Sequence, residues 1–267
     1  MAGFERRTLA PPVEAVRESY APECLVLDAG ADFETLPPEA AEELGLLVEA
    51  LNPAAYPADW LPEDAPAQLR RYAGGDFTIG MPGDGTVVRT RQTEPPTVIA
   101  KKRAEGTPED FLGFLFAEAF VELSLGVPEH FLPFFGESYR DLAAATPLGP
   151  NETYQLAAAL FDAWVGLAAR EEFAGWSPDE SGESHPAVHT AWVDAGERLT
   201  GRLDDLPGEV ARGKTSFTAA TEYACAAVKH DLDLPAPFSA LDTDAYRDHG
   251  PEYAVRWAEK TFGSLAE

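Results

Sequence analysis

The chain has 267 residues, and its 46 Asp and Glu outnumber its 20 Lys and Arg so far that the formal net charge is −26. Such an excess of one sign repels itself in dilute buffer, but it becomes tolerable where molar salt shortens the screening length to roughly 3 Å. The composition therefore predicts a protein of the cytosol of a salt-accumulating microbe, and we do not expect nucleic acid to bind the surface as a whole, because its phosphates would meet a negative field.

Hydropathy and cysteine content narrow the class of protein further. Hydrophobic residues make up 45% of the chain, enough for a substantial core. No apolar run follows the charged residues within 1–7, so we expect no secretory signal. The most hydrophobic stretch, 111–127, is too short to span a bilayer, so we expect a soluble cytoplasmic protein with no membrane partner. Cys24 and Cys225 lie in apolar runs and are expected to be buried, reduced thiols.

The first 105 residues mix predicted strands and helices. The apolar run Cys24–Asp28 predicts a buried strand, and the prolines ahead of residues 39–51 predict a helix there. Residues 52–66 are rich in proline and are predicted to be irregular. A β-meander is predicted over 77–103, with strands at 77–80, 86–92 and 97–103 and turns at 81–85 and 93–96.

From residue 106 onward the pattern is helical. Thr107-Pro-Glu-Asp110 is a helix start, with a cap residue, a proline and acids in the first turn. The helix predicted over 108–125 is apolar nearly all round, which is typical of a helix central to the core. Apolar stripes at helical spacing predict further helices that begin at Asn151 and cover 186–206, 215–231 and 251–262, with loops at 177–184 and 234–237.

These elements predict an α+β fold. A small antiparallel β-meander, with an N-terminal strand and helix, is expected to pack on a predominantly α-helical C-terminal body. The first part covers 1–105 and the helical body covers 106–267. Because Gly106-Thr107 is too short for a free linker, we expect one compact unit rather than two independent domains.

A basic region precedes the long apolar helix. Residues 86–104 contain five basic residues and a single acid, Glu94, so this stretch carries +4 while the rest of the chain carries −30. The basic side chains either pair with surrounding acids or form a site for an anionic small molecule or an acidic protein segment. Which faces they share depends on the hairpin register, which does not follow from the sequence. The candidate anion- or partner-binding residues are Arg89, Arg91, Lys101, Lys102 and Arg103.

Two carboxylates interrupt the apolar helix. Glu118 and Glu122 are four residues apart and so lie on one face of it. They either form a narrow solvated stripe or are paired inside the protein. As paired carboxylates they would form a buried ion pair, chiefly with Lys101 or Arg103, or an acid/base group with a raised pKa.

Two further sequence patterns, a phosphate-loop motif and a pair of histidines, have the spacing of binding motifs but not the surrounding sequence that such motifs need. Residues 208–215 match G-x-x-x-x-G-K-[ST], which holds phosphates where a buried strand runs into the loop. Residues 202–207 are acidic and end in proline, so we predict a helix–helix turn capped by Thr215 and no nucleotide. His185 and His189 have a spacing that can hold a metal ion on a helix. Since no H-E-x-x-H is present, we predict surface histidines and neither metal nor cofactor.

The segment 74–123 resembles the small lobe of protein kinase-like phosphotransferases. A glycine-containing hairpin is followed by Thr97-Val-Ile-Ala-Lys101, which is similar to the strand motif that ends in the phosphate-binding lysine. The helix bearing Glu118 and Glu122 comes next, where that family keeps the glutamate partner. The hairpin turn departs from G-x-G-x-x-G, and Tyr139-Arg140-Asp141 matches the catalytic loop without its asparagine.

Taken whole, the chain resembles uncharacterised conserved proteins of haloarchaea. The resemblance rests on the acidic, lysine-poor composition and on two stretches, Thr90–Val98 (TRQTEPPTV) and Pro128–Gly136 (PEHFLPFFG). It implies a source and a compartment, and it attaches no activity.

Two functional hypotheses from different classes follow. The leading hypothesis is a non-catalytic binding or interaction module that uses a basic hairpin face. The alternative is an enzyme, a kinase-like phosphotransferase or another, that acts on a phosphorylated small molecule.

The net charge generates a prediction about salt. Because screening removes self-repulsion, the melting temperature is expected to rise across a KCl series from dilute to molar. Thermal unfolding monitored by circular dichroism measures it. A melting temperature that stays flat or falls as KCl is added would contradict the halophilic interpretation.

Overall fold

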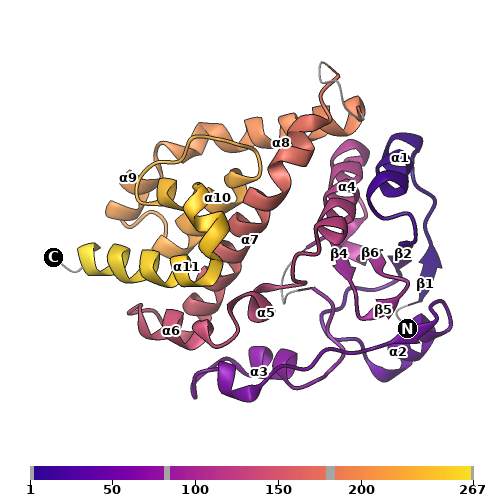
Figure 1. The fold of residues 1–267 in the computed structure, drawn as a ribbon, viewed down its shortest axis with the longest axis horizontal. Helices are drawn as coiled ribbons and strands as arrows, with labels where there is room; N and C mark the ends of the chain where they lie inside the picture. The colour runs from indigo at the N-terminus through magenta and orange to yellow at the C-terminus, as the bar shows by residue number, and fades with distance from the viewer. Residues whose placement is uncertain (1–2, 81–84, 179–183, 266–267) are drawn as a thin grey trace. The chain divides into compact units, whose positions relative to one another are not determined.

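The computed structural model describes residues 3–80, 85–178 and 184–265 (Figure 1). Contacts group the described residues into two compact units that interleave along the chain. The first unit lies within Met1–Tyr56, Arg71–Glu129 and Glu172–Trp192, and the second lies within Pro57–Arg70, His130–Glu171 and Val193–Glu267.

The first unit is built on a four-stranded mixed sheet with the strand order β1-β2-β6-β4. The central strands β2 and β6 are parallel, with Val26 opposite Val98 and Asp28 opposite Ala100. The outer strands β1 and β4 run antiparallel to their neighbours, and β3 pairs with β5 in a separate two-stranded ribbon. The strands are β1 Phe4–Arg6, β2 Leu25–Ala29, β3 Ala50–Leu51, β4 Val87–Thr90, β5 Thr93–Glu94 and β6 Thr97–Ala100.

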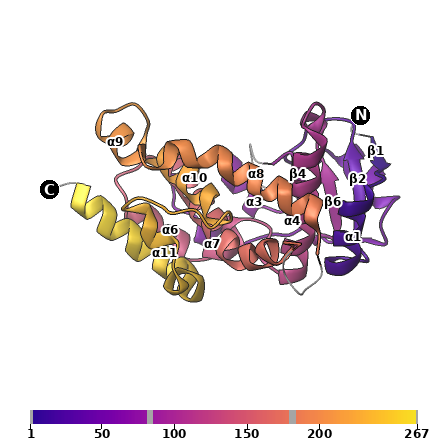
Figure 2. The ribbon, with the colours of Figure 1, turned by 90° about the horizontal axis from the view of Figure 1, so that it is seen from above.

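Both faces of the central strands are covered, which is why their sequences are nearly continuous apolar runs. The helices α1 (Pro11–Tyr20) and α4 (Glu109–Leu125) lie together on one face (Figures 1 and 2). Residues on the other face pack with Phe33, Leu36 and the helix α2 (Pro38–Gly45) in one hydrophobic cluster. Since side chains alternate along a strand, Ile99 belongs to this cluster while Val98 faces α4.

The predicted α+β class is confirmed, but the sheet is assembled differently from the predicted meander. The hairpin of β4 and β6 forms, and β6 then continues the sheet by pairing in parallel with β2. Residues 77–80 contribute a single bridge, between Thr35 and Thr78. The predicted turn at 81–85 lies, except for Gly85, outside the described residues. The edge of β6 that the predicted meander would leave unpaired is thus taken by a distant apolar strand, β2.

The helix α4 begins and ends close to the predicted bounds, and it belongs to the same unit as the sheet. The sequence grouped it with the helical body that starts at residue 106. Its sheet-facing side packs on β4 and β6 and its neighbour is α1, so its all-round apolar character reflects burial within the first unit.

Three predicted helices differ in their bounds. The helix expected over 39–51 ends at Gly45, because Ala50 and Leu51 pair with β5 instead. The cap of the helix after the phosphate-loop pattern is Ser216, whose hydroxyl accepts from the backbone N–H of Ala219, and not Thr215. The last helix starts at Asp244, and Gly250 breaks it with φ 44° just before the predicted start at Pro251.

The second unit is helical and aromatic. Trp164 and Phe161 stack at 6.4 Å between ring centroids, and Phe134 lies 4.8 Å from Trp164. The buried hydroxyl of Tyr246 donates to the carbonyl of Leu160 at 2.6 Å.

The α-helices not yet named belong to the second unit or contribute to both units. They are α3 Ala67–Ala73, α5 Phe131–Phe135, α6 Ser138–Ala144, α7 Pro150–Gly175, α8 Pro186–Leu203, α9 Leu206–Ala211, α10 Phe217–Val228 and α11 Asp244–Leu265. The 3₁₀ helices among the described residues are η1 Ala58–Trp60, η2 Lys102–Ala104 and η3 Phe238–Leu241.

Two further observations bear on the class of protein. Both Cys24 and Cys225 are buried free thiols, and burial raises the pKa of Cys24 to about 12. Of the helices in the described part of the chain, none is both long enough and apolar enough to cross a membrane.

Candidate functional site

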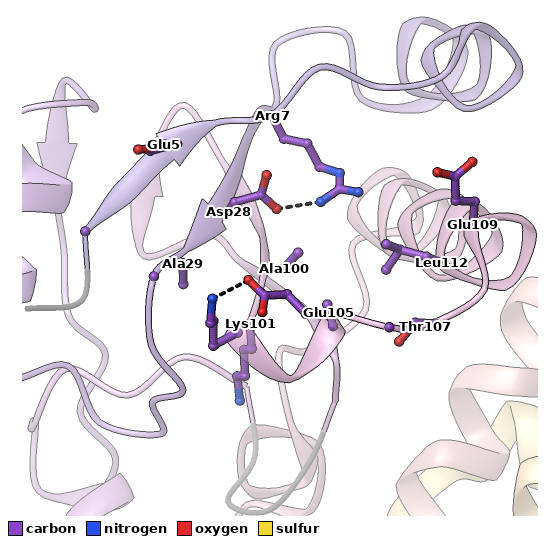
Figure 3. Close-up of a pocket in the computed structure, with 15 residues that line it drawn as sticks. Glu5, Arg7, Asp28, Ala29, Ala100, Lys101, Glu105, Thr107, Glu109 and Leu112 are labelled. Carbon is purple, nitrogen blue, oxygen red and sulfur yellow. Dashed lines mark hydrogen bonds and ion pairs between the residues drawn. The ribbon is translucent and has the colours of Figure 1, made fainter.

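A crevice of about 690 Å³ opens in the first unit where the parallel strands β2 and β6 end (Figure 3). Carboxyl ends of neighbouring parallel strands meet at one edge of a sheet, and ligands of open α/β sheets bind at that edge. The crevice is bounded by the strand ends, by the turn that follows β6 and by the first turns of α4, with Leu112 on its wall. Small residues, Ala29, Ala100 and Ala104 among them, leave its interior open.

An ion pair crosses the sheet end inside this crevice. Arg7 follows β1, Asp28 lies near the end of β2, and Figure 3 shows their side chains turned toward each other. The guanidinium Nη1 lies 2.5 Å from Asp28 Oδ1, with side-chain exposures of 28% and 45%. The same guanidinium stacks over the ring of Phe116 in α4, at 4.9 Å from the ring centroid. The aromatic contact and the carboxylate together hold the cation in place.

The turn after β6 supplies a second ion pair. Lys102 begins the 3₁₀ helix η2, and its ammonium pairs with the carboxylate of Glu105, with side-chain exposures of 49% and 70%. Both residues line the crevice, and exposed Glu5 and Glu109 lie on its rim. An exposed pair of this kind contributes little to stability, so Lys102 is available to exchange its partner.

The other two basic residues of this turn are placed differently. Lys101 contributes to the crevice wall, but it is buried and its ammonium lies 5.3 Å from the centroid of Phe33, which belongs to the cluster on the far face of the sheet. Arg103 pairs with Asp32 at 3.2 Å. The backbone N–H of Arg103 also donates to Asp32 and holds the pKa of that carboxyl below its ordinary value.

Two of the three arginines of the predicted site, Arg89 and Arg91, point to the α4 face. The guanidinium of Arg89 pairs with Glu122 and donates at 2.8 Å to the carbonyl of Pro128. Arg91 donates to the carbonyl of Leu123. The five predicted basic residues therefore divide among three surroundings: two lie against α4, Lys102 lines the crevice beside Lys101, and Arg103 lies beside Asp32. Their role in binding an anion stays a prediction.

The paired carboxylates predicted on α4 are half-buried. Glu122 pairs with Arg89, and their side-chain exposures are 18% and 7%. The sequence proposed Lys101 or Arg103 for such a pair. Arg89 is the better placed residue because Glu122 faces β4, and Lys101 faces the opposite side of the sheet.

Sequence reasoning gave no role to Glu129, which is enclosed by polar groups of the first unit. Its carboxylate accepts from the amide of Gln92 at 2.8 Å and from the hydroxyl of Thr90 at 2.9 Å. Burial raises the pKa of Glu129 above its ordinary value of 4.5, against the hydrogen bonds and the nearby Arg89, which lower it. Burial and the charge of Glu129 also raise the pKa of Tyr56 to about 12.

The remaining sequence patterns do not converge on a site. In the phosphate-loop pattern, residues 206–211 form the helix α9, so a helix and not a strand leads into the loop. His185 is buried, precedes α8, and is not the surface residue that was predicted. Within residues 3–80, 85–178 and 184–265, no group of three or more His, Cys, Asp or Glu is arranged to hold a metal ion.

Comparison of the sequence with known protein families finds one family that spans both units. The chain belongs to a family of unknown function, DUF7089, whose profile matches residues 3–265. Neither a search of curated proteins nor a search of solved structures found a significant match.

Arg89 generates a stability prediction. Arg89→Ala leaves Glu122 and two backbone carbonyls without their donor, so the variant is expected to lose about 3 kcal/mol in free energy of unfolding. Arg91→Ala, which removes one contact of an exposed side chain, is the matched control and is expected to lose less than about 1 kcal/mol. Urea denaturation at fixed KCl measures both.

A double variant separates the charge effect from a packing effect. Arg89→Met with Glu122→Met removes both charges together and is expected to recover much of the loss. If Arg89→Ala and Arg91→Ala proved equally stable, the structural role assigned to the Arg89–Glu122 pair would be wrong.

Glu129 generates a prediction about pH. A raised pKa in the folded state means that the protonated carboxyl contributes stability below pH 4.5 that is lost as the pH rises through the folded pKa. Glu129→Gln mimics the protonated form, so its melting temperature relative to wild type is expected to rise as the pH is raised from 4.5 through the folded-state pKa of Glu129. Glu252→Gln, at an exposed position of α11, controls for the loss of one negative charge. A difference that stays constant with pH would contradict the prediction.

Proposed function

We propose that the protein is a non-catalytic binding protein that takes an anionic small molecule in the crevice at the ends of β2 and β6. The observation that carries the proposal is the crevice itself. It lies where the parallel strands end, and two partly exposed cations, Arg7 and Lys102, line it. Its volume of about 690 Å³ is within the range typical of small-molecule sites, roughly 300–1,000 Å³.

The anionic group of the ligand would replace a carboxylate at each of these cations. Arg7 presents a guanidinium whose fork suits a phosphate or a carboxylate, and Phe116 holds that guanidinium in place. Lys102 adds a mobile point charge from the turn. Such contacts are short, so they persist in molar salt, whereas attraction over longer distances is screened.

A small molecule suits this site better than an acidic protein segment, the other partner that the sequence predicts. A segment would cross the rim, where exposed Glu5 and Glu109 would repel its carboxylates. A small ligand can place its anionic group inside and avoid them.

The contacts lend no support to the phosphotransferase alternative. In the kinase-like arrangement Lys101 would pair with a glutamate of α4. Here Glu122 pairs with Arg89, and the Lys101 ammonium lies 5.3 Å from the ring centroid of Phe33, in the cluster on the face of the sheet opposite α4.

The cytosol of a salt-accumulating microbe, such as a haloarchaeon, is the compartment that we propose. The net charge of −26 supports it, because molar salt screens the self-repulsion that this charge causes.

Calorimetric titration with ethyl phosphate and with propionate in molar KCl tests the proposed function. At least one of the two is expected to bind, and Lys102→Gln is expected to weaken that binding about tenfold, since a hydrogen bond to a charged group contributes about 1.5 kcal/mol. Arg103→Gln is the matched control, because Arg103 is the next residue of the same turn and pairs with Asp32 outside the crevice.

Two results would overturn this proposal. One is the absence of binding by both compounds to the wild-type protein. The other is a Lys102→Gln variant that binds as tightly as the wild type and as the Arg103→Gln control.

A further inference from the structure

The charges that line the crevice are of both signs. Three cations, Arg7, Lys101 and Lys102, meet four carboxylates, and the carboxylates are Glu5, Asp28, Glu105 and Glu109. Two of these acids are already paired, Asp28 with Arg7 and Glu105 with Lys102. A site built for a multiply charged anion would carry an excess of cations, and this one carries one more acid than base.

An anionic ligand that takes Arg7 leaves Asp28 without its partner. The Asp28 side chain is 45% exposed, against 70% for Glu105, so water compensates Asp28 less well. A carboxylate that loses its cation in a partly enclosed site bears a desolvation cost, which opposes binding of a ligand that brings only negative charge. A ligand that also brings a positive group restores the lost pair.

We propose that the ligand is zwitterionic, with a phosphate or carboxylate that binds Arg7 and Lys102 and an ammonium group that binds Asp28. This inference rests on the proposed function and specifies the class of its ligand. Binding is then an exchange of partners: Arg7 and Lys102 each trade a carboxylate for the ligand's anionic group, and Asp28 trades Arg7 for the ligand's ammonium. No charge is left unpaired at Asp28.

A metal ion is not the partner that these carboxylates select. Among the described residues, no three of them converge as a metal ion requires. The positive group is therefore organic, and an ammonium, with three donors, fits between separate carboxylates.

A pair of ligands that differ by one group tests the inference. O-Phosphoethanolamine and ethyl phosphate share the phosphate and differ in the ammonium, and β-alanine and propionate form the corresponding pair of carboxylates. In molar KCl the zwitterion of the better-binding pair is expected to bind about tenfold more tightly than its partner. The two pairs also distinguish a phosphate from a carboxylate as the anionic group.

The variant Asp28→Asn tests whether Asp28 is the residue that binds the ammonium group of the ligand. This variant is expected to bind both members of a pair equally, because the preference for the ammonium is lost with the charge. Asp76→Asn, which alters an ion-paired aspartate of the same unit outside the crevice, is the matched control and is expected to keep the preference.

The outcomes separate the two proposals. If ethyl phosphate or propionate binds wild type as tightly as its zwitterion, the zwitterionic ligand is wrong and the proposed function stands. If neither ethyl phosphate nor propionate binds the wild type, the proposed function itself fails, whatever the zwitterions do. Should Asp28→Asn fold and keep the preference, the assignment of Asp28 is overturned. Should it not fold, the wild-type comparison of each zwitterion with its partner still decides whether the ligand is zwitterionic.

Discussion

The parallel pairing of β2 and β6 is the interaction on which the first unit depends. Two apolar runs far apart in sequence, Leu25–Ala29 and Thr97–Ala100, lie side by side and are covered on both faces. Because both strands run the same way, the residues that end them, Asp28 and the Lys101–Lys102 turn, come to one edge. The antiparallel strand β1 then brings Arg7 to Asp28, and α4 starts beside the same edge. The crevice is a consequence of that geometry.

A second constraint is the alternation of side chains along each strand. Arg89 and Val98 face α4, whereas Ile99 and Lys101 face the opposite side. Basic residues that are neighbours in the sequence therefore meet different environments. Arg89, which is nearly buried, is satisfied by a carboxylate and by backbone carbonyls, as the several donors of a guanidinium allow. Lys102, which lies in a turn, stays half-exposed and exchangeable.

The fold class and most helices were predictable, since they depend on local signals. The start of α4 lies within Thr107-Pro-Glu-Asp110, with the predicted acids in its first turn, but its N-cap is Pro108 and not Thr107, and no side chain caps it. The hairpin of β4 and β6 follows from the proline turn between them. The position of β2 beside β6 was not predictable, because pairing at that separation is decided by the total burial of the sheet and not by local pattern. Arg7 was missed for the same reason, as β1 is three residues long and carries no apolar alternation.

The candidate site was predictable only in part. Lys101 and Lys102 were singled out as part of a basic stretch, and Asp28 was recognised as the polar end of an apolar run. Nothing in the sequence joined them, because Asp28 and Lys102 are brought together by the parallel pairing alone. Glu129 carried no signal either, since its partners Thr90 and Gln92 lie on a hairpin whose register is set by tertiary contacts.

The overall charge and the crevice fit the same physical setting. A body of net charge −26 repels anions at a distance, and in molar salt that repulsion falls off within roughly 3 Å. Long-range attraction is then unable to draw a ligand in, and selectivity has to come from contacts at hydrogen-bond distance. Partly buried charges at such distances, like Arg7 with Asp28, are screened less than exposed charges that lie far apart. A ligand that carries an ammonium beside its anionic group brings less net negative charge into the field of the protein than a simple anion does, so the surface acids oppose its binding less.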